Sequence, residues 1–333
     1  IHSETLMQKE PIDPKVYDLY DEYCHSQMTR RDFLNKASVL SVIGGTGLAM
    51  ANALLPNYAE AQTVSFTDKR LKARYVMYDS PGGTSGKMKG YLVKPNGEGS
   101  FPVVLIVHEN RGLNPYIEDV ARRAAIEGFL ALAPDGLAPI GGYPGNDDDG
   151  KVMQKSLDKN KLFTDMLNSA KFLKGHDLST GKLGVTGFCY GGGVVNNLAV
   201  SLGKDLAAGV PFYGRAPATK DVAMIHAALM MQYAENDPRV NATREEYRKA
   251  LEENNKDFII YTYEGTRHGF HNNSTPRYNE KQAKIIKIVI FRINEPAKDV
   301  YNYGLTTTDI INLMINFSSK LFSVCLKYSP SYH

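Results

Sequence analysis

Residues 185–193, Val-Thr-Gly-Phe-Cys-Tyr-Gly-Gly-Gly, place a cysteine where an apolar strand should turn sharply into a helix. Apolar residues continue at helical spacing from Val194 to Leu202. The pattern Gly-x-Cys-x-Gly has the spacing of a nucleophile elbow, with sulfur in place of the commoner serine oxygen. Glycines are needed because side chains two positions either side of Cys189 would collide with the strand and the helix. The segment predicts a thiol above a helix N-terminus, whose positive end favours the thiolate; a buried structural cysteine is the alternative.

The composition is that of an ordinary soluble globular protein. Of 333 residues, 43% are hydrophobic and 23% are charged. The formal net charge of +3 is not gathered in any long basic run, which argues against a dedicated nucleic-acid binder. The three cysteines, Cys24, Cys189 and Cys325, show no Cys-x-x-Cys spacing of a metal site.

From about Arg74 onward, apolar stretches of strand type alternate with amphipathic stretches of helix type. Strands are expected at 73–78, 90–93, 102–107, 129–133, 183–186, 208–213, 229–233 and 258–263. Helices are expected from Pro115 with Asn114 as N-cap, over 155–173, after Cys189 and over 243–254, with a loop over 141–150. This alternation predicts an α/β fold, a doubly wound and mostly parallel sheet with helices on both faces.

Reactive side chains follow several of the expected strands. Ligand sites of such sheets lie beyond the carboxyl ends of the strands, so these residues should share one rim. Cys189, Asp237 and His268 occur there in the chain order nucleophile, acid and histidine. His268 could exchange a proton with the thiol and the leaving group, and Asp237 could orient the imidazole and stabilise its charge. The alternatives are a turn-forming aspartate before Pro238 and a surface-loop histidine.

Five stretches together resemble the dienelactone hydrolase family, cysteine hydrolases of the α/β-hydrolase fold. They are VHENRGLN at 107–114, ALAPDGL at 131–137, GFCYGGG at 187–193, YAENDPRV at 233–240 and YEGTRHGFHN at 263–272. The resemblance covers about residues 70–284 and is strongest to the exported, twin-arginine branch of that family. It implies hydrolysis of a small ester or lactone through a thioester acyl-enzyme, with no metal or organic cofactor.

The family's catalytic roles carry over onto matching positions. The resemblance implies Cys189 as nucleophile, Asp237 as acid and His268 as base. Glu109 matches the family's glutamate near the nucleophile, which helps to control the protonation of the thiol. A buried carboxylate beside a thiol could accept the thiol proton when substrate displaces it; a solvated loop glutamate is the alternative.

The resemblance also implies an oxyanion hole made of two backbone N–H groups. Tyr190 follows the nucleophile, and Asn110 lies on the loop after the 102–107 strand.

The chain departs from the family pattern at the arginine that binds a substrate carboxylate. The family places this arginine a few residues after the histidine in HSFAR-type sequences, where this chain has Phe-His-Asn-Asn at 270–273. Three other arginines are alternatives at unmatched positions: Arg267, Arg277 and Arg215. The departure disfavours a dienelactone carboxylate as the substrate.

The C-terminus departs as well. The family closes with an amphipathic helix, which this chain starts at 280–284 before an Ile-, Asn-, Tyr- and Lys-rich tail begins. We hypothesise that the atypical tail, 285–333, is divergent through a frameshift or a mispredicted end.

The N-terminal region is expected to direct export. Thr29-Arg30-Arg31-Asp32-Phe33-Leu34 precedes a weakly apolar stretch over 37–55 and the small-x-small pattern of residues 59–61. This order resembles a twin-arginine signal, with cleavage after Ala61 and the twin-arginine export machinery as partner. A helix start with two basic residues, or an uncleaved anchor, is the alternative. The glycines of the stretch make it too weak for stable membrane insertion, so the mature protein is expected to be periplasmic or otherwise exported.

Four segments result from these interpretations. They are a polar extension at 1–28, a signal segment at 29–61, an α/β-hydrolase domain at 62–284 and the tail at 285–333. A small-molecule ester or lactone is the expected substrate. Two other classes stay open: a non-catalytic binding protein that keeps the fold, and a thiol-based redox sensor built on one easily oxidised cysteine.

Overall fold

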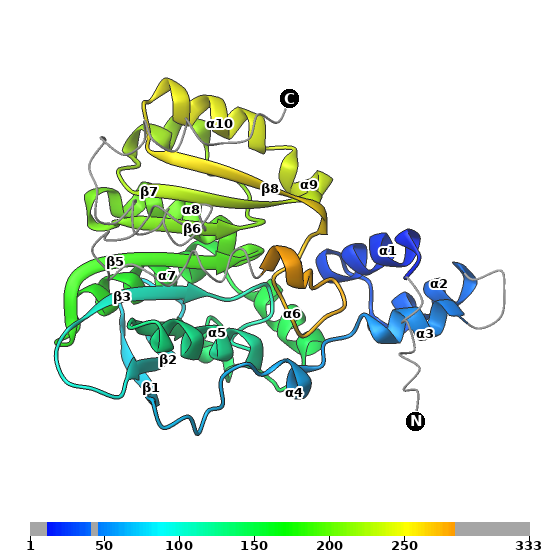
Figure 1. Cartoon of the computed structure of the whole chain (residues 1–333), viewed down its shortest axis with the longest axis horizontal. Helices are drawn as coiled ribbons and strands as arrows, with labels where there is room; N and C mark the ends of the chain where they lie inside the picture. Colours follow the sequence, from blue (N-terminus) through cyan, green and yellow to red (C-terminus); the bar gives the residue numbers. More distant parts are fainter. Residues whose placement is uncertain (1–11, 41–45, 284–333) are drawn as a thin grey trace, which may run out of the picture.

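A computed structural model describes residues 12–40 and 46–283, and its centre is one eight-stranded sheet (Figure 1). The order of strands across the sheet is β1-β2-β4-β3-β5-β6-β7-β8. Strands β1 and β2 form an antiparallel hairpin, β2 pairs antiparallel with β4, and all other neighbours are parallel. The strand bounds are β1 Leu71–Ser80, β2 Gly86–Pro95, β3 Phe101–Val107, β4 Leu130–Pro134, β5 Ser179–Phe188, β6 Ala208–Phe212, β7 Ala228–Asn236 and β8 Phe258–Arg267.

Strand β3 shows why the sheet is buried on both sides. Val103, Leu105 and Val107 join one apolar cluster, while Val104 and Ile106 join the other. Successive side chains of a strand point to opposite faces, so a continuous apolar run fits a strand that is covered twice. The predicted doubly wound sheet is confirmed.

Helices cover both faces of this sheet. The helices between the strands are α5 Pro115–Ile126, α6 Asp147–Ser156, α7 Lys159–Lys174, α8 Tyr190–Leu202, α9 Pro238–Asn241 and α10 Arg244–Glu253, with short 3₁₀ turns at Ala138–Ile140, Gly203–Asp205 and Thr219–Met224. Helix α5 packs into one apolar cluster, and α7, α8 and α10 pack into the other. Asn114 caps α5 as predicted, because its side chain accepts a hydrogen bond from the N–H of Ile117.

One predicted helix is wrong in its extent. The helix expected over 155–173 is two helices, and α6 begins inside the expected loop of 141–150. The break falls at Asp158, whose carboxylate accepts hydrogen bonds from the N–H groups of Asn160 and Lys161, each at 2.9 Å. An aspartate in this N-cap position starts a new helix, which the apolar spacing alone did not separate.

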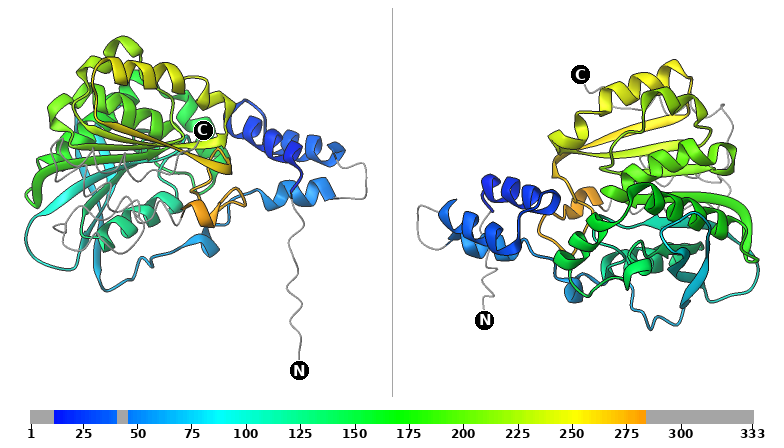
Figure 2. Two further views of the ribbon diagram at one scale, coloured as in Figure 1. Left: turned by 45° about the horizontal axis from the view of Figure 1, so that its top comes forward. Right: turned by 180° about the vertical axis from the view of Figure 1, so that it is seen from behind.

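The N-terminal region folds into helices α1 Pro14–His25, α2 Arg30–Leu40 and α3 Thr46–Ala53, which we call the N-terminal helical unit; the short α4 Tyr58–Ala61 follows. The unit lies beside the carboxyl ends of the parallel strands (Figures 1 and 2). The sequence interpretation found no apolar period in this extension, yet Val16, Tyr20, Tyr23 and Cys24 are buried on one face of α1. Charged residues between them hid the period.

The predicted cleavage point is held against the segment that follows β8. Ala61 is buried, and its carbonyl accepts a hydrogen bond from Asn273 Nδ2 at 2.7 Å. The N–H of Asn57 donates to the carbonyl of Ser274 at 2.7 Å. Within residues 12–40 and 46–283, no helix is both long and apolar enough to span a bilayer. The export signal and the segment boundaries stay predictions, and the tail from 285 lies outside the described residues.

Candidate active site

Cys189 lies on a strained turn between β5 and α8. Its backbone has φ 57° and ψ −111°, a conformation that residues other than glycine rarely adopt. A Cβ on Gly191 would lie 2.3 Å from the carbonyl oxygen of Val107, and one on Gly187 would lie 2.5 Å from that of Gly191. The steric need for glycine on both sides of the cysteine is therefore confirmed, and the turn raises the thiol above the end of β5.

Asp237 and His268 reach the same point from neighbouring strands. Asp237 directly follows β7 and caps α9, and His268 directly follows β8. His268 Nδ1 lies 2.5 Å from Asp237 Oδ2, and both side chains are buried. The Cys189 sulfur lies within 4.8 Å of the ligating nitrogen of His268. The structure thus brings together all three residues that the sequence proposed as nucleophile, base and acid.

The charges at this point favour a thiolate beside an imidazolium. Burial would raise the pKa of the Cys189 thiol, but the positive charge of His268 and hydrogen bonds from His268 and His25 hold it well below its usual value. Burial would lower the pKa of His268, but the negative charges of Cys189 and Asp237 raise it to about 9. These charges therefore favour the thiolate, the reactive form of a cysteine.

Glu109 is buried close to the thiol. Its Oε2 accepts a hydrogen bond from Asn272 Nδ2 at 3.1 Å. Burial raises the pKa of this carboxyl, the Arg111 guanidinium lowers it, and the Cys189 charge raises it further. Glu109 is therefore neither a solvated loop residue nor a fully paired anion, and it can carry a proton in the site.

Two residues are predicted for the oxyanion hole, Tyr190 next to Cys189 in the chain and Asn110 after β3. Tyr190 is the first residue of α8, so its N–H has no acceptor within the helix. Asn110 lies three residues beyond Val107, whose carbonyl oxygen and that of His108 pack against Gly191. The Asn110 side chain donates instead to the carbonyl of Cys24 in α1, at 3.0 Å.

A second histidine contacts the thiol and was missed by the sequence reasoning. His25, at the end of α1, places Nε2 3.5 Å from the Cys189 sulfur. Its Nδ1 lies 2.8 Å from the carbonyl oxygen of Asp21, and its ring meets that of His268 edge-on. Arg239 Nη2 lies 3.0 Å from His25 Nε2. The apolar period of α1 was a signal that this segment packs as a helix. It could not indicate what the helix packs against, because 164 residues separate His25 from Cys189.

His25, Cys189 and His268 are also the residues best placed to hold a metal ion among those described. Their ligating atoms lie within 4.8 Å of one another. The hydrogen bond to the Cys189 thiolate places a proton on His25 Nε2, which leaves no lone pair there for a metal, and the Arg239 guanidinium lies 3.0 Å from the same nitrogen. A cation at that distance disfavours a second cation, so the group is better suited to proton transfer.

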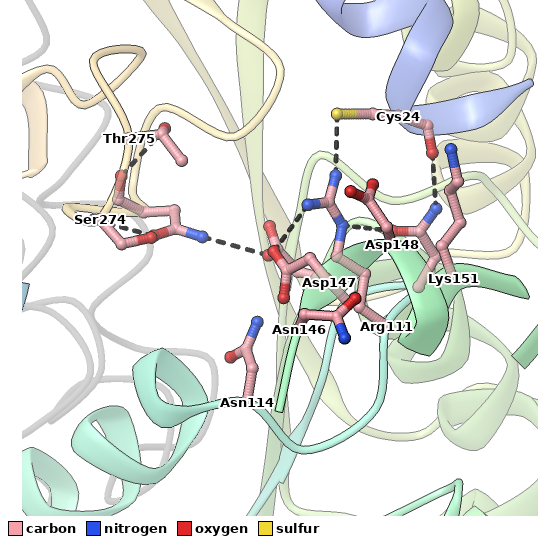
Figure 3. A network of polar contacts seen from close by, with 12 residues as sticks. Cys24, Arg111, Asn114, Asn146, Asp147, Asp148, Lys151, Ser274 and Thr275 are labelled. Atoms are coloured by element: carbon pink, nitrogen blue, oxygen red, sulfur yellow. Dashed lines mark hydrogen bonds and ion pairs between the residues drawn. The ribbon is translucent and has the colours of Figure 1, made fainter. Parts of the chain in front are cut away.

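A buried arginine supports the wall between α1 and α6. Arg111 pairs with Asp147 at 2.7 Å and donates through Nη2 to the Cys24 sulfur at 2.8 Å (Figure 3). Of the three arginines considered as carboxylate ligands, Arg277 donates to the carbonyl of His268 at 2.8 Å and Arg267 pairs with Asp18 of α1. Arg111, Arg267 and Arg277 therefore have partners within the chain, and those of Arg111 and Arg267 include residues of α1.

Comparisons with known proteins agree with this geometry. A family model described as the dienelactone hydrolase family matches residues 88–287, and a second, described as YqhI-like, matches residues 4–42. "Putative hydrolase fragment YghX" of Escherichia coli (strain K12) is 58% identical over 114 residues, which are 34% of this chain and 97% of that protein. "Putative carboxymethylenebutenolidase" of Methylorubrum extorquens is 29% identical over 260 residues, 72% of this chain and 86% of that protein.

A solved structure gives the same result. The putative dienelactone hydrolase from Klebsiella pneumoniae is 25% identical and superposes with a TM-score of 0.56, over 64% of this chain and 94% of its own. The matched family model begins within β2, runs past β8 and includes Cys189, Asp237 and His268. This chain therefore belongs to the dienelactone hydrolase family and is a carboxylic ester hydrolase.

Proposed function

We propose that this protein hydrolyses small esters or lactones through a Cys189–His268–Asp237 triad and a thioester acyl-enzyme. The observation that carries the proposal is the strained elbow, which holds Cys189 against an imidazole that lies 2.5 Å from a buried carboxylate. Nucleophile, base and orienting acid in this arrangement are the parts that acyl transfer requires.

The reaction has two halves. The Cys189 thiolate attacks the carbonyl carbon, and the N–H groups of Tyr190 and Asn110 stabilise the oxyanion that forms. His268 then gives its proton to the leaving oxygen, the C–O bond breaks, and a thioester remains. In the second half, His268 takes a proton from water, hydroxide adds to the thioester carbonyl, and the C–S bond breaks to release the acid and restore the thiolate.

Asp237 and Glu109 control where protons are held during this cycle. Asp237 holds the imidazole in one tautomer and stabilises the imidazolium of each half-reaction. Glu109, whose pKa burial raises, would take the proton from any molecule in which Cys189 is still a thiol, so that His268 stays charged for the leaving group.

The thioester is the feature that a test should detect. The full chain is mixed with a p-nitrophenyl ester or a simple lactone, quenched in acid within its first turnovers, and analysed by peptide mass spectrometry. We expect turnover and an acyl adduct on the peptide that contains Cys189. Absence of both would contradict the proposal, and rapid peroxide oxidation of Cys189 without ester turnover would favour a thiol redox sensor.

The N-terminal region supports a second proposal, that the chain is exported by the twin-arginine machinery. Arg30 and Arg31, followed by Phe33-Leu34 and the Ala59-Glu60-Ala61 pattern, carry it. We expect N-terminal sequencing of the chain secreted by an expressing bacterium to begin at Gln62. The control is the double variant Arg30→Lys, Arg31→Lys. If the parent chain stays in the cytoplasm to the same extent as this variant, export by this route is contradicted.

A further inference from the structure

The end of helix α1 occupies the approach to the thiol. His25 Nε2 lies 3.5 Å from the Cys189 sulfur. A carbonyl carbon about to be attacked must lie at about 3–3.5 Å from its nucleophile, so it would need the space in which the imidazole lies. Substrate and His25 would therefore compete for this side of the sulfur.

The active-site wall also satisfies the last carbonyl groups of α1. A helix leaves these carbonyls without partners of its own. Asn110 Nδ2 donates to the carbonyl of Cys24 at 3.0 Å, and Lys151 Nζ donates to that of Tyr23 at 2.7 Å and to that of Met28 at 3.2 Å. A peptide carbonyl of α1 is thus bound by Asn110, the residue proposed to bind the substrate oxyanion.

Charge complementarity continues along α1. Asp18 pairs with Arg267 at 2.5 Å, and Asp21 lies 4.0 Å from Arg239. The Arg277 guanidinium lies 4.7 Å from the ring centre of Tyr20. Acidic and aromatic groups of α1 therefore face the cations at the ends of the strands, as two surfaces built for each other do.

The unit that carries α1 has an apolar core of its own. Val16, Tyr20 and Tyr23 of α1 pack with Phe33 of α2 and with Leu54, just after α3. The unit can consequently bring α1 to the site, or take it away, as one body. The YqhI-like match, at residues 4–42, covers α1 and α2 and ends before the hydrolase match begins at residue 88.

We propose that the active-site face of this hydrolase is a docking surface for its own N-terminal helical unit, which masks Cys189 until the unit is displaced. The masked chain reacts only through the fraction of molecules in which α1 has left the site. Cleavage after Ala61 would remove the unit whole. The proposal rests on the proposed function only in taking Cys189 as the nucleophile, and its test separates the two.

The first test measures access to the thiol in the full chain. Alkylation of Cys189 by iodoacetamide is followed by peptide mapping, which separates it from the other cysteines. His25→Ala removes the group over the sulfur, and Asp18→Lys places a like charge against Arg267 without touching the site. We expect alkylation to accelerate about tenfold in His25→Ala and about fivefold in Asp18→Lys.

Ser38→Ala is the matched control, because the Ser38 hydroxyl donates only to the carbonyl of Asn35 within α2. Alkylation in Asp18→Lys at the rate of Ser38→Ala would overturn the proposal. Loss of ester turnover in His25→Ala, with alkylation unchanged, would also overturn it and make His25 a proton carrier of the reaction. Faster alkylation with no ester turnover in any variant would uphold the docking and refute the hydrolase mechanism.

The second test needs no substitution. A carboxamidomethyl group on Cys189 competes with His25 for the same space. Because the coupling is reciprocal, alkylation of Cys189 must weaken the docking of α1 if docking of α1 slows the alkylation. We expect amide hydrogen exchange across residues 14–25 to rise at least about tenfold after complete modification, with exchange in α10 unchanged. Unchanged exchange in α1 at full modification would overturn the proposal.

Discussion

Replacing Cys189 by alanine is expected to lower kcat/KM for a short-chain aryl ester by about 10⁴-fold or more, because it removes the nucleophile of the proposed acyl intermediate. Cys189→Ser keeps the shape of the elbow but replaces a depressed thiol pKa with a hydroxyl that His268 must deprotonate during attack. We expect its rate to lie between those of the parent and Cys189→Ala. Steady-state kinetics with equal fold stability among the variants provides the measurement.

His268→Gln completes this series and adds a pH readout. Without the imidazolium, burial dominates and the pKa of Cys189 rises. Between pH 7 and pH 8 we expect alkylation to change by less than about twofold in the parent and to rise by about tenfold in His268→Gln, where the thiolate still has to form. His176→Gln, at a histidine outside the site, is the control. Equal pH profiles in parent and His268→Gln would contradict the ion pair.

Gly191→Ala is expected to destabilise the folded chain by about 3 kcal/mol, because the added methyl group meets backbone rather than a flexible side chain. Its Cβ would lie 2.3 Å from the carbonyl oxygen of Val107 and 2.6 Å from that of His108. Relief requires β3 and α8 to separate, which also moves Cys189 and the oxyanion-hole residues. The unfolding free energy from denaturant titration gives the stability.

Gly193→Ala is the matched control for this prediction. It lies two residues further along α8, and the nearest atoms to its added Cβ are backbone atoms of Arg215 at 3.7 Å. Alanine there should be neutral or stabilise the helix by up to about 1 kcal/mol. Equal unfolding free energies for the two variants, within error, would show that the elbow is not crowded as described.

The fold could be predicted because its signals are local. Continuous apolar runs such as 102–107 mark strands buried on both faces, and Asn114 before Pro115 marks a helix start. The break at Asp158 was lost because its cap competes with a helical period that runs through it. Glycine spacing around Cys189 was informative because it reports steric contacts within one turn of chain.

The three proposed catalytic residues could also be predicted from the sequence. Parallel strands end on one rim, so residues that follow β5, β7 and β8 must meet there whatever the loops do. The chain order of Cys189, Asp237 and His268 then limited their roles. Distances could not be predicted, and neither could the burial of Glu109 against Asn272.

The sequence by itself determined the sheet, the elbow and the three residues that meet at its rim, since each depends on spacing within a strand, a turn or a helix. Only the tertiary structure decided what lies on the thiol. His25 reaches Cys189 across 164 residues of chain, through a helix whose charges had made it look like a polar extension. Its position depends on side chains of α1, α6 and the strand-end loops fitting one another, and such contacts leave no periodic trace in the sequence.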